Sequence, residues 1–138
     1  MLHQRLIHPT ILESLASAGH GARILITDAN YPASTRLGEN ADLVYLNLAP
    51  GKPTVTEVLD VLLTVVPVED AAVMTPDDGP EPRIFEEFRT LLPHIELTKY
   101  DRFEFYEEAS GPDTCLQIVT GEQRLYANIL LTIGVVAP

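Results

Sequence analysis

Short runs of aliphatic residues, bounded by glycine, proline and other turn-forming residues, recur along the chain. Residues 24–26 read Ile-Leu-Ile and residues 129–131 read Ile-Leu-Leu, without a polar residue in either run. Such unbroken runs are typical of strands that are buried on both faces of a sheet. On this pattern we expect strands at 23–28, 43–48, 68–74, 95–100, 116–119 and 129–133.

Between these runs, apolar residues recur at helical spacing. The clearest helix start is Thr54 with Glu57 three residues later, a capping box that predicts a helix running towards Pro67. Apolar residues at the spacing of a helix face predict two further helices, at 82–92 and 102–109.

The N-terminal region contains a second capping-box pattern. Thr10 is followed three residues later by Glu13, and apolar residues follow at helical spacing. This pattern predicts a first helix that begins at Thr10 and stops at Gly19, because glycine readily adopts the left-handed backbone that ends helices.

Helices and strands alternate over the whole chain, which is the signature of an α/β fold. The sequence contains no repeat, no low-complexity stretch and no linker. We therefore expect a single domain over 1–138, a sheet flanked by helices on both faces. Ligands of such sheets tend to lie beyond the carboxyl ends of strands, which draws attention to Asp28 and to residues 120–122.

The charge of the chain narrows the choice of partners. Its 138 residues include 20 acidic and 9 basic side chains, a formal net charge of −11. This balance repels nucleic-acid phosphates and anionic membrane surfaces, so we expect neither nucleic acid nor a membrane as a partner. No apolar run is long enough for a membrane span or a signal peptide, and we expect a cytoplasmic protein.

Several catalytic motifs are missing. Cys115 is the only cysteine, which excludes an internal disulfide and a multi-cysteine metal site. The chain has no phosphate-binding glycine loop, no dinucleotide fingerprint, no histidine pair at metal-binding spacing and no nucleophile elbow. These absences disfavour phosphoryl transfer, hydride transfer and zinc-dependent hydrolysis, and we expect no metal and no cofactor.

His20 is the first candidate for acid–base chemistry. It lies between Gly19 and Gly21 at a predicted helix-to-strand turn, where small neighbours leave an imidazole accessible. Histidine side chains exchange protons near neutral pH, so a role as general acid is available to His20. The alternative is an ordinary loop histidine that follows a glycine cap.

Two charged residues are candidates for binding a hydroxylated ligand. Asp28 ends an aliphatic strand, and its carboxylate at the sheet edge could accept hydrogen bonds from hydroxyls. The alternative is a turn aspartate bonded to its own backbone. Arg102 lies close to Phe103 and Tyr106 and could donate to a ring oxygen while the rings stack on a sugar. The alternative is a surface arginine beside core aromatics.

Tyr126 and Asn128 form a third candidate pair. They alternate around Ala127 just before the last predicted strand, so an extended backbone would direct both side chains to the same side. A phenol and an amide placed in this way can orient a polyol. The alternative is a strand tyrosine followed by a turn asparagine.

Taken together, these motifs resemble the RbsD/FucU family of ribose pyranases and fucose mutarotases, in register along nearly the whole chain. The order and spacing of the motifs are specific, although each one is short. The residues that carry the resemblance are His8-Pro9, Gly19-His20-Gly21, Asp28-Ala29-Asn30-Tyr31-Pro32-Ala33, Arg102-Phe103, Phe105-Tyr106-Glu107, Thr120-Gly121-Glu122, Tyr126-Ala127-Asn128-Ile129-Leu130 and Gly134-Val135.

The resemblance implies an isomerase that interconverts forms of a free monosaccharide by opening its ring, without a metal. It implies His20 as the proton donor and Asp28, Arg102, Tyr126 and Asn128 as sugar-binding residues. Arg102 stands where ribose-type members usually carry histidine, which favours L-fucose over a related aldose such as D-ribose. The resemblance also implies a homo-oligomer, a ring-shaped decamer with the sugar pocket near subunit contacts.

Two other functions are compatible with the sequence. A non-catalytic sugar-binding or transport-associated subunit would use the same aspartate, arginine, tyrosine and asparagine, although binding alone does not require His20. An aldose–ketose isomerase or a small hydrolase would need a metal site or an activated nucleophile, and the sequence contains neither motif.

Overall fold

One six-stranded sheet organises the molecule, and the computed structural model describes residues 1–138. The strands lie side by side in the order β2-β5-β1-β6-β3-β4. The two unbroken aliphatic runs form β1 and β6, which are neighbours in the middle of the sheet. The bounds of the strands are β1 Arg23–Thr27, β2 Asp42–Tyr45, β3 Val68–Met74, β4 Leu97–Tyr100, β5 Thr114–Val119 and β6 Ile129–Ile133.

Only β6 runs against its neighbours. β1 is parallel to β5 and antiparallel to β6, and β2 is parallel to β5. β3 is antiparallel to β6 and parallel to β4. The ends of the five parallel strands and the start of β6 therefore meet at one side of the sheet, which we call the carboxyl edge. The starts of those strands and the end of β6 form the opposite edge.

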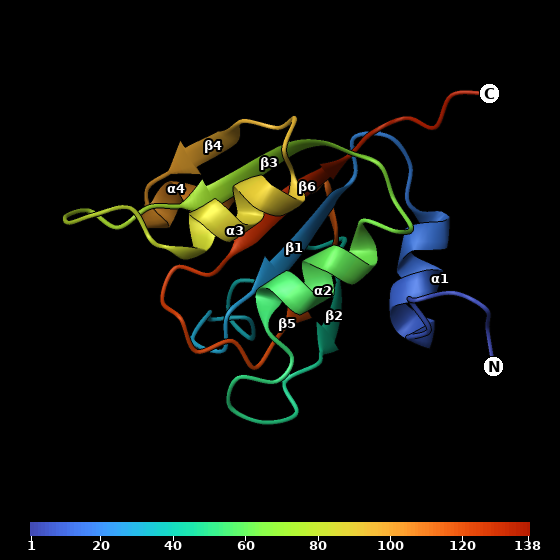
Figure 1. Ribbon diagram of the computed structural model, residues 1–138, viewed down its shortest axis with the longest axis horizontal. Helices are drawn as coiled ribbons and strands as arrows, with labels where there is room; N and C mark the ends of the chain where they lie inside the picture. Colours follow the sequence, from blue (N-terminus) through green and yellow to red (C-terminus); the bar gives the residue numbers. More distant parts are fainter.

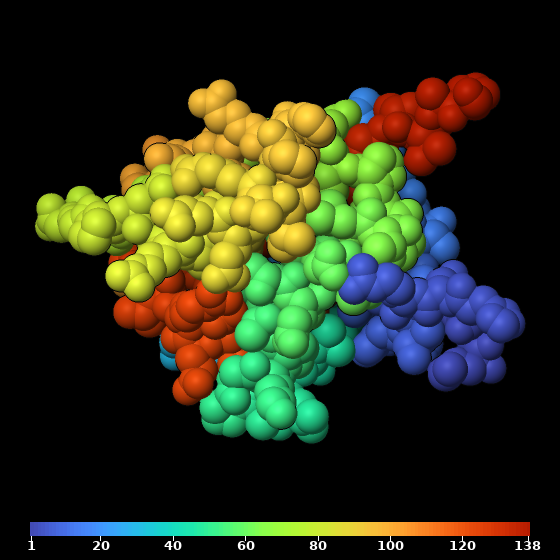
Figure 2. All heavy atoms as spheres, viewed as in Figure 1, coloured from blue at the N-terminus to red at the C-terminus, as the bar shows by residue number.

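Helices cover both faces of the sheet, which confirms the predicted α/β class. Helices α1 (Pro9–Ser17), α2 (Val55–Leu62) and α3 (Ile84–Leu91) pack on one face, and α4 (Arg102–Ala109) packs on the other (Figure 1). In the space-filling view, α2 in green and α3 in yellow lie side by side over the sheet (Figure 2). None of these helices combines the length and apolar character needed to cross a membrane.

Alternate residues of β1 belong to two hydrophobic cores. Ile24 and Ile26 pack beneath α1, α2 and α3, whereas Leu25 packs beneath α4. All three side chains are fully buried, and burying one such side chain contributes about 1.5–3 kcal/mol. Because both faces of the strand are covered, a polar residue at any of the three positions would be buried without solvent. This is the physical reason for the unbroken aliphatic run.

The first helix begins earlier than the sequence predicted. It starts at Pro9, and its N-cap is His8, whose Nδ1 accepts a hydrogen bond from the Ile11 amide (3.3 Å). Proline is favoured in the first turn because that position needs no amide donor. Thr10 therefore lies inside the helix, and the predicted cap at Thr10 is wrong.

The end of the first helix also differs from the prediction. The helix ends at Ser17, two residues before Gly19, and its C-cap Ala18 has an extended backbone. The left-handed backbone in this region belongs instead to Gly21, with φ of 83°. The glycine that the turn requires is therefore the one that follows His20.

The second predicted capping box is confirmed. The Glu57 amide donates to the Thr54 hydroxyl (3.2 Å), and the Thr54 amide donates to the Glu57 carboxylate (2.7 Å). The helix that follows ends at Leu62, well before Pro67, because residues 63–65 form turns. Strands β2 and β4 are likewise shorter than the sequence predicted.

Candidate functional site

A hydrogen-bonded pair, Asp28 and Asn128, lies at the carboxyl edge between β1 and β6. The Asp28 amide donates to Asn128 Oδ1 (2.9 Å), and Asn128 Nδ2 donates to Asp28 Oδ2 (3.2 Å). Each residue is 3% exposed. The pair forms because β6 runs opposite to β1, so the residue after β1 meets the residue before β6. Two of the predicted site residues are thus in direct contact.

The Asp28 carboxyl group holds its proton more tightly than an ordinary aspartate. Burial raises its pKa above the usual 3.8, and the hydrogen bonds from the Asn30 amide (2.9 Å) and from Asn128 offset this only in part. A carboxyl group with a raised pKa is better matched to proton transfer near neutral pH. Asp28 can therefore both bind a hydroxyl group and exchange a proton with it.

Arg102 reaches the carboxyl edge from the start of α4. The helix begins directly after β4 because Asp101 caps it with a capping box. Arg102 Nε donates to the hydroxyl of Tyr106, one turn further along the helix (3.1 Å). This bond fixes the guanidinium near the tyrosine ring and leaves its other N–H groups free to donate to a ligand.

Tyr126 has a left-handed backbone, with φ of 61°, in the segment between β5 and β6. This conformation is uncommon for a residue other than glycine and is found more often at functional sites. The predicted extended backbone over Tyr126 and Asn128 is therefore wrong at Tyr126. Both side chains nevertheless line the same cavity.

The cavity at the carboxyl edge has a volume of about 180 Å³. Four of the five predicted site residues lie in its wall, and so does Tyr106, whose ring the sequence suggested as a stacking surface beside Arg102. Sequence analysis did not assign the remaining wall residues to the site. No three His, Cys, Asp or Glu side chains gather in a geometry that could hold a metal ion. The residues of the wall are Asp28, Asn30, Tyr31, Met74, Arg102, Tyr106, Leu125, Tyr126 and Asn128.

A larger cavity, of about 480 Å³, lies between the N-terminal segment and α2. Its wall is mainly apolar and includes an ion pair between Arg5 and Asp60. None of the predicted site residues lies there, and it has neither a buried carboxyl group nor an amide. The smaller cavity is therefore the better candidate for binding a hydroxylated ligand.

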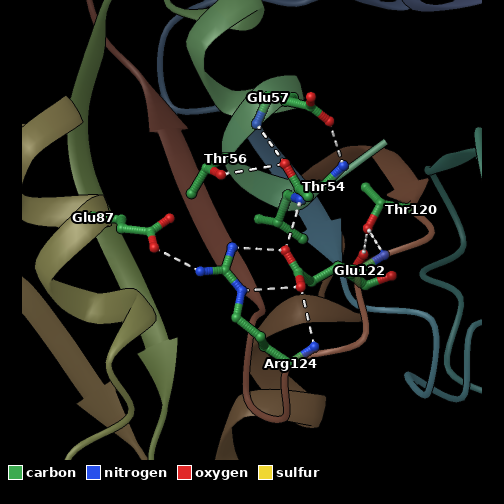
Figure 3. Close-up of polar contacts among 9 residues, drawn as sticks. Thr54, Thr56, Glu57, Glu87, Thr120, Glu122 and Arg124 are labelled. Atoms are coloured by element: carbon green, nitrogen blue, oxygen red, sulfur yellow. Dashed lines mark hydrogen bonds and ion pairs between the residues drawn. The ribbon is translucent and has the colours of Figure 1, made fainter. Parts of the chain in front are cut away.

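The segment between β5 and β6 is anchored by a buried glutamate. The Glu122 carboxylate, 3% exposed, accepts hydrogen bonds from Arg124 Nε (3.0 Å) and Nη2 (2.9 Å) and from the Val55 amide (3.4 Å) (Figure 3). Arg124 Nη1 donates to Glu87 of α3 (2.6 Å). Burial opposes ionisation of Glu122, but the hydrogen bonds from Arg124 outweigh it and lower its pKa. The charged network ties this segment to α2 and α3.

Gly121 allows a neighbouring loop to approach this segment closely. Its amide donates to the Pro53 carbonyl (3.0 Å), and its carbonyl accepts from the Gly51 amide (2.6 Å). A Cβ atom at position 121 would overlap the carbonyl oxygens of Ala49 and Lys52. No side chain fits at this position, which explains the glycine of the Thr-Gly-Glu motif.

His20 lies at the opposite edge of the sheet. It precedes β1, whereas Asp28 follows the same strand. Its Nε2 atom lies 2.9 and 3.0 Å from the two carboxylate oxygens of Glu69, near the start of β3. Both side chains are well exposed, at 58% and 45%. The structure therefore does not bring His20 to the other four predicted residues within one copy of the chain.

Comparisons of the sequence with known proteins find relatives over nearly its whole length. A family model described as the RbsD / FucU transport protein family matches residues 1–136. The fucose mutarotase of Homo sapiens is 31% identical over 148 residues, covering 96% of this chain and 91% of that protein. The fucose mutarotase of Mus musculus is 31% identical over 146 residues, covering 94% and 90%.

Solved structures with the same fold include two with a bound sugar. The fucose mutarotase from Streptococcus pneumoniae, in complex with L-fucose, is 29% identical with a TM-score of 0.84, covering 99% of this chain and 100% of that one. RbsD from Bacillus subtilis, complexed with D-ribose, is 25% identical with a TM-score of 0.85, covering 99% of each chain.

Proposed function

Because the chain belongs to the RbsD/FucU family, we propose that it is a monosaccharide mutarotase, an isomerase that interconverts the anomers, or the pyranose and furanose forms, of a free sugar. The observation that carries this proposal is the cavity at the carboxyl edge, whose wall gathers a carboxyl group, an amide, phenols and a guanidinium. All of these groups form hydrogen bonds with hydroxyl groups. The similarity to fucose mutarotases over almost the whole chain supports the reaction.

Mutarotation needs a proton donor and a proton acceptor, with no net oxidation. The anomeric hydroxyl loses its proton while the ring oxygen gains one, so the ring C–O bond breaks and an open-chain aldehyde forms. Rotation about the C1–C2 bond and the reverse proton transfers give the other anomer. Positioned proton transfer contributes about 10²–10⁴ in rate, which is a useful gain because the uncatalysed reaction already proceeds in water.

The roles that the family resemblance implies agree with the chemistry of each side chain. His20 protonates the ring oxygen. Asp28 and Arg102 hold hydroxyl groups of the sugar, and Asp28 has the raised pKa that suits proton exchange. Tyr126 and Asn128 position the anomeric end. No step in this scheme requires a metal or a cofactor.

His20 can act on the sugar only from a second copy of the chain. Gly21, Ala22 and the five residues of β1 separate it from Asp28, and β1 alone spans about 16 Å, longer than a monosaccharide ring. A homo-oligomer in which the opposite edge of one copy faces the carboxyl edge of the next would complete each site. Glu69 would then hold the imidazole at Nε2 and leave Nδ1 for the sugar. A closed ring, such as the decamer that the resemblance implies, would give every copy this contact.

Within this function we favour a 6-deoxy sugar such as L-fucose over D-ribose. L-Fucose carries a methyl group that ribose lacks, and Met74 and Leu125 offer apolar surface in the cavity wall. Phe103, 67% exposed, lies edge-on to Tyr106 beside this wall and adds to that surface. A sugar without the methyl group would leave this apolar area without a partner.

A non-catalytic monosaccharide-binding or transport-associated subunit is the second candidate function. The description of the matching family as a transport protein family favours it. The same cavity would bind a sugar without converting it. The presence of His20 favours catalysis instead, because binding alone needs no residue that donates a proton.

Magnetisation-transfer NMR of anomeric exchange tests the choice between the two functions. L-Fucose, D-ribose and other aldoses are each measured with the wild-type protein, with the His20→Ala variant and without protein. We expect faster exchange of L-fucose with the wild type and exchange at the rate in buffer with His20→Ala. Line broadening that reports binding, without faster exchange of any sugar, would support the non-catalytic subunit.

Mixed oligomers test whether two copies form one site. His20→Ala and Asp28→Asn each disable one edge, so either variant alone should be inactive. Co-assembled in equal amounts, the two variants should regain activity, because about a quarter of the contacts between copies join an intact His20 to an intact Asp28. A mixture that stays inactive after co-assembly would argue against a shared site.

A further inference from the structure

Tyr31 places a polar atom without a partner beside the candidate sugar cavity. The residue is 7% exposed, and its hydroxyl is buried and forms no hydrogen bond. Its amide donates to the Asp28 carbonyl (3.4 Å), and the residue lines the same cavity as Asp28 and Arg102. Buried hydroxyl groups nearly always have a partner, so this one requires an explanation.

Packing explains the ring of Tyr31 but not its hydroxyl. The ring lies edge-on to Tyr106, with 5.4 Å between centroids, and edge-on to Phe105, with 6.4 Å. A phenylalanine would make both ring contacts without bringing an oxygen into the interior. The hydroxyl therefore costs the ligand-free protein a desolvation penalty that no contact within the fold offsets.

The surroundings of Tyr31 keep its phenol protonated. Burial raises the pKa of Tyr31 far above its ordinary value; the nearby Tyr106 and Asp28 act in the same direction, and Arg36 opposes them. A neutral phenol can both donate and accept a hydrogen bond. Neither the Asp28 carboxyl group, which is paired with Asn128, nor the Tyr106 hydroxyl, which accepts a bond from Arg102, forms a hydrogen bond with the Tyr31 hydroxyl. A hydroxyl group that arrives with a ligand can supply the missing partner.

We propose that Tyr31 is a further substrate-binding residue that determines specificity, and that its hydroxyl exchanges a hydrogen bond with one hydroxyl of the sugar held by Asp28 and Arg102. This inference rests on the proposed function, because it assigns a role within the same cavity. The ligand supplies the partner that the fold does not. A site that leaves a polar group unpaired discriminates against a ligand that lacks the matching hydroxyl.

The Tyr31→Phe variant tests this role, with exchange and binding of L-fucose measured by NMR. Losing one neutral hydrogen bond to the ligand should raise KM about five- to tenfold, while kcat stays within about twofold. The thermal midpoint of the ligand-free protein should stay the same or rise, because the variant removes an unpaired buried hydroxyl. A purely structural role predicts a lower midpoint with unchanged KM, and that result would overturn the proposal.

Thr114→Val provides a matched control. The Thr114 hydroxyl is also buried without a partner, but it lies at the start of β5, at the opposite edge from the cavity. This variant should leave the KM for L-fucose unchanged. Equal increases of KM in both variants would trace the effect to general packing and would also overturn the proposal.

Single-position deoxy derivatives of L-fucose identify the sugar hydroxyl that Tyr31 contacts. The derivative that lacks this hydroxyl should bind the wild type and Tyr31→Phe equally, whereas the others should keep the five- to tenfold difference. If Tyr31→Phe binds every derivative as tightly as the wild type, the role of Tyr31 is refuted, while exchange by the wild type still supports the mutarotase. If the wild type neither binds nor exchanges any sugar, both proposals fall together.

Discussion

The two edges of the sheet hold their functional side chains in different ways. At the carboxyl edge, Asp28 and Asn128 are almost completely buried and are hydrogen-bonded to each other. At the opposite edge, the His20 side chain is 58% exposed and its ring is held by Glu69 alone. Asp28 and Asn128 therefore contribute to the stability of the fold as well as to the site, whereas His20 contributes little to stability.

This difference matches the proposed roles of the two edges, which are sugar binding at the carboxyl edge and proton donation by His20. Buried groups that are already oriented recognise a ligand with little further loss of freedom, although burying Asp28 has a cost. The exposed His20 imidazole is little packed within its own copy, as the proposed contact with a neighbouring copy requires. We therefore expect substitutions of Asp28 and Asn128 to change stability and activity together, and substitutions of His20 to change activity alone.

The largest effect should come from His20→Ala. The variant removes the proposed proton donor, so the rate of anomeric exchange should fall about 10²–10⁴-fold, as measured by magnetisation-transfer NMR. Its thermal midpoint should match that of the wild type, because the imidazole is exposed. His94→Ala is the control, since His94 is an exposed histidine at a distance from the site along the chain, and it should keep full activity. Full activity in His20→Ala would show that His20 is not the proton donor and that the two edges do not have the separate roles proposed for them.

Gly121→Ala should have the largest effect on stability at the carboxyl edge. The added methyl group would overlap the Ala49 and Lys52 carbonyl oxygens, so the loop and the segment before β6 must separate. We expect a loss of about 3 kcal/mol in the free energy of unfolding, measured by urea denaturation, together with reduced exchange. In the control Gly19→Ala, the added methyl group has no atom within 4 Å, so the free energy of unfolding should change little. Equal stability of the two variants would show that the close approach at Gly121 is unimportant.

Asp28→Asn should reveal the cost of burying a carboxylate through the pH dependence of stability. Because the pKa of Asp28 is raised in the folded state, the folded protein binds this proton more tightly than the unfolded chain does. The stability that the proton contributes is complete below the ordinary value of 3.8 and is lost as pH rises through the folded pKa. Denaturation at several pH values should therefore show wild type losing stability relative to Asp28→Asn as pH rises. A gain relative to the variant over that range would contradict the raised pKa.

Glu87→Gln should have the smallest effect. The side chains of Glu87 and Arg124 are 49% and 41% exposed, so breaking this bridge should lower the free energy of unfolding, measured in urea, by only about 0.5 kcal/mol. Exchange activity should be unchanged. Glu122→Gln removes the buried partner of the same guanidinium and should lower the free energy of unfolding clearly more. If both variants lower it equally, burial of Glu122 is not what anchors the segment before β6.

Local sequence patterns were sufficient to predict most elements of the fold. Two kinds of pattern that extend over only a few residues predict their elements correctly. They are the capping box at Thr54 and Glu57 and the aliphatic runs that form β1 and β6. The cap at Thr10 was misread because His8 and Pro9 form a less common start that meets the same requirement for a capped first turn.

The arrangement of the site depends on long-range topology, which local patterns do not encode. A buried aliphatic run has the same appearance in a parallel and an antiparallel strand, so the reversed direction of β6, and with it the contact of Asp28 with Asn128, could not be predicted. Conversely, His20 and Asp28 are only eight residues apart in the sequence, yet an extended strand places them at opposite edges.

The pairing of β1 has a consequence for how the protein is made. β1 pairs only with β5 and β6, although it is made before either of them. Its aliphatic residues therefore have no strand partner until residues 114–133 have been synthesised, since translation proceeds from the N-terminus. A product of interrupted translation that ends before residue 128 lacks β6 and Asn128 together. In such a fragment β1 and β3 each lose their pairing with β6 and leave an open strand edge in the middle of the sheet, which favours aggregation or degradation.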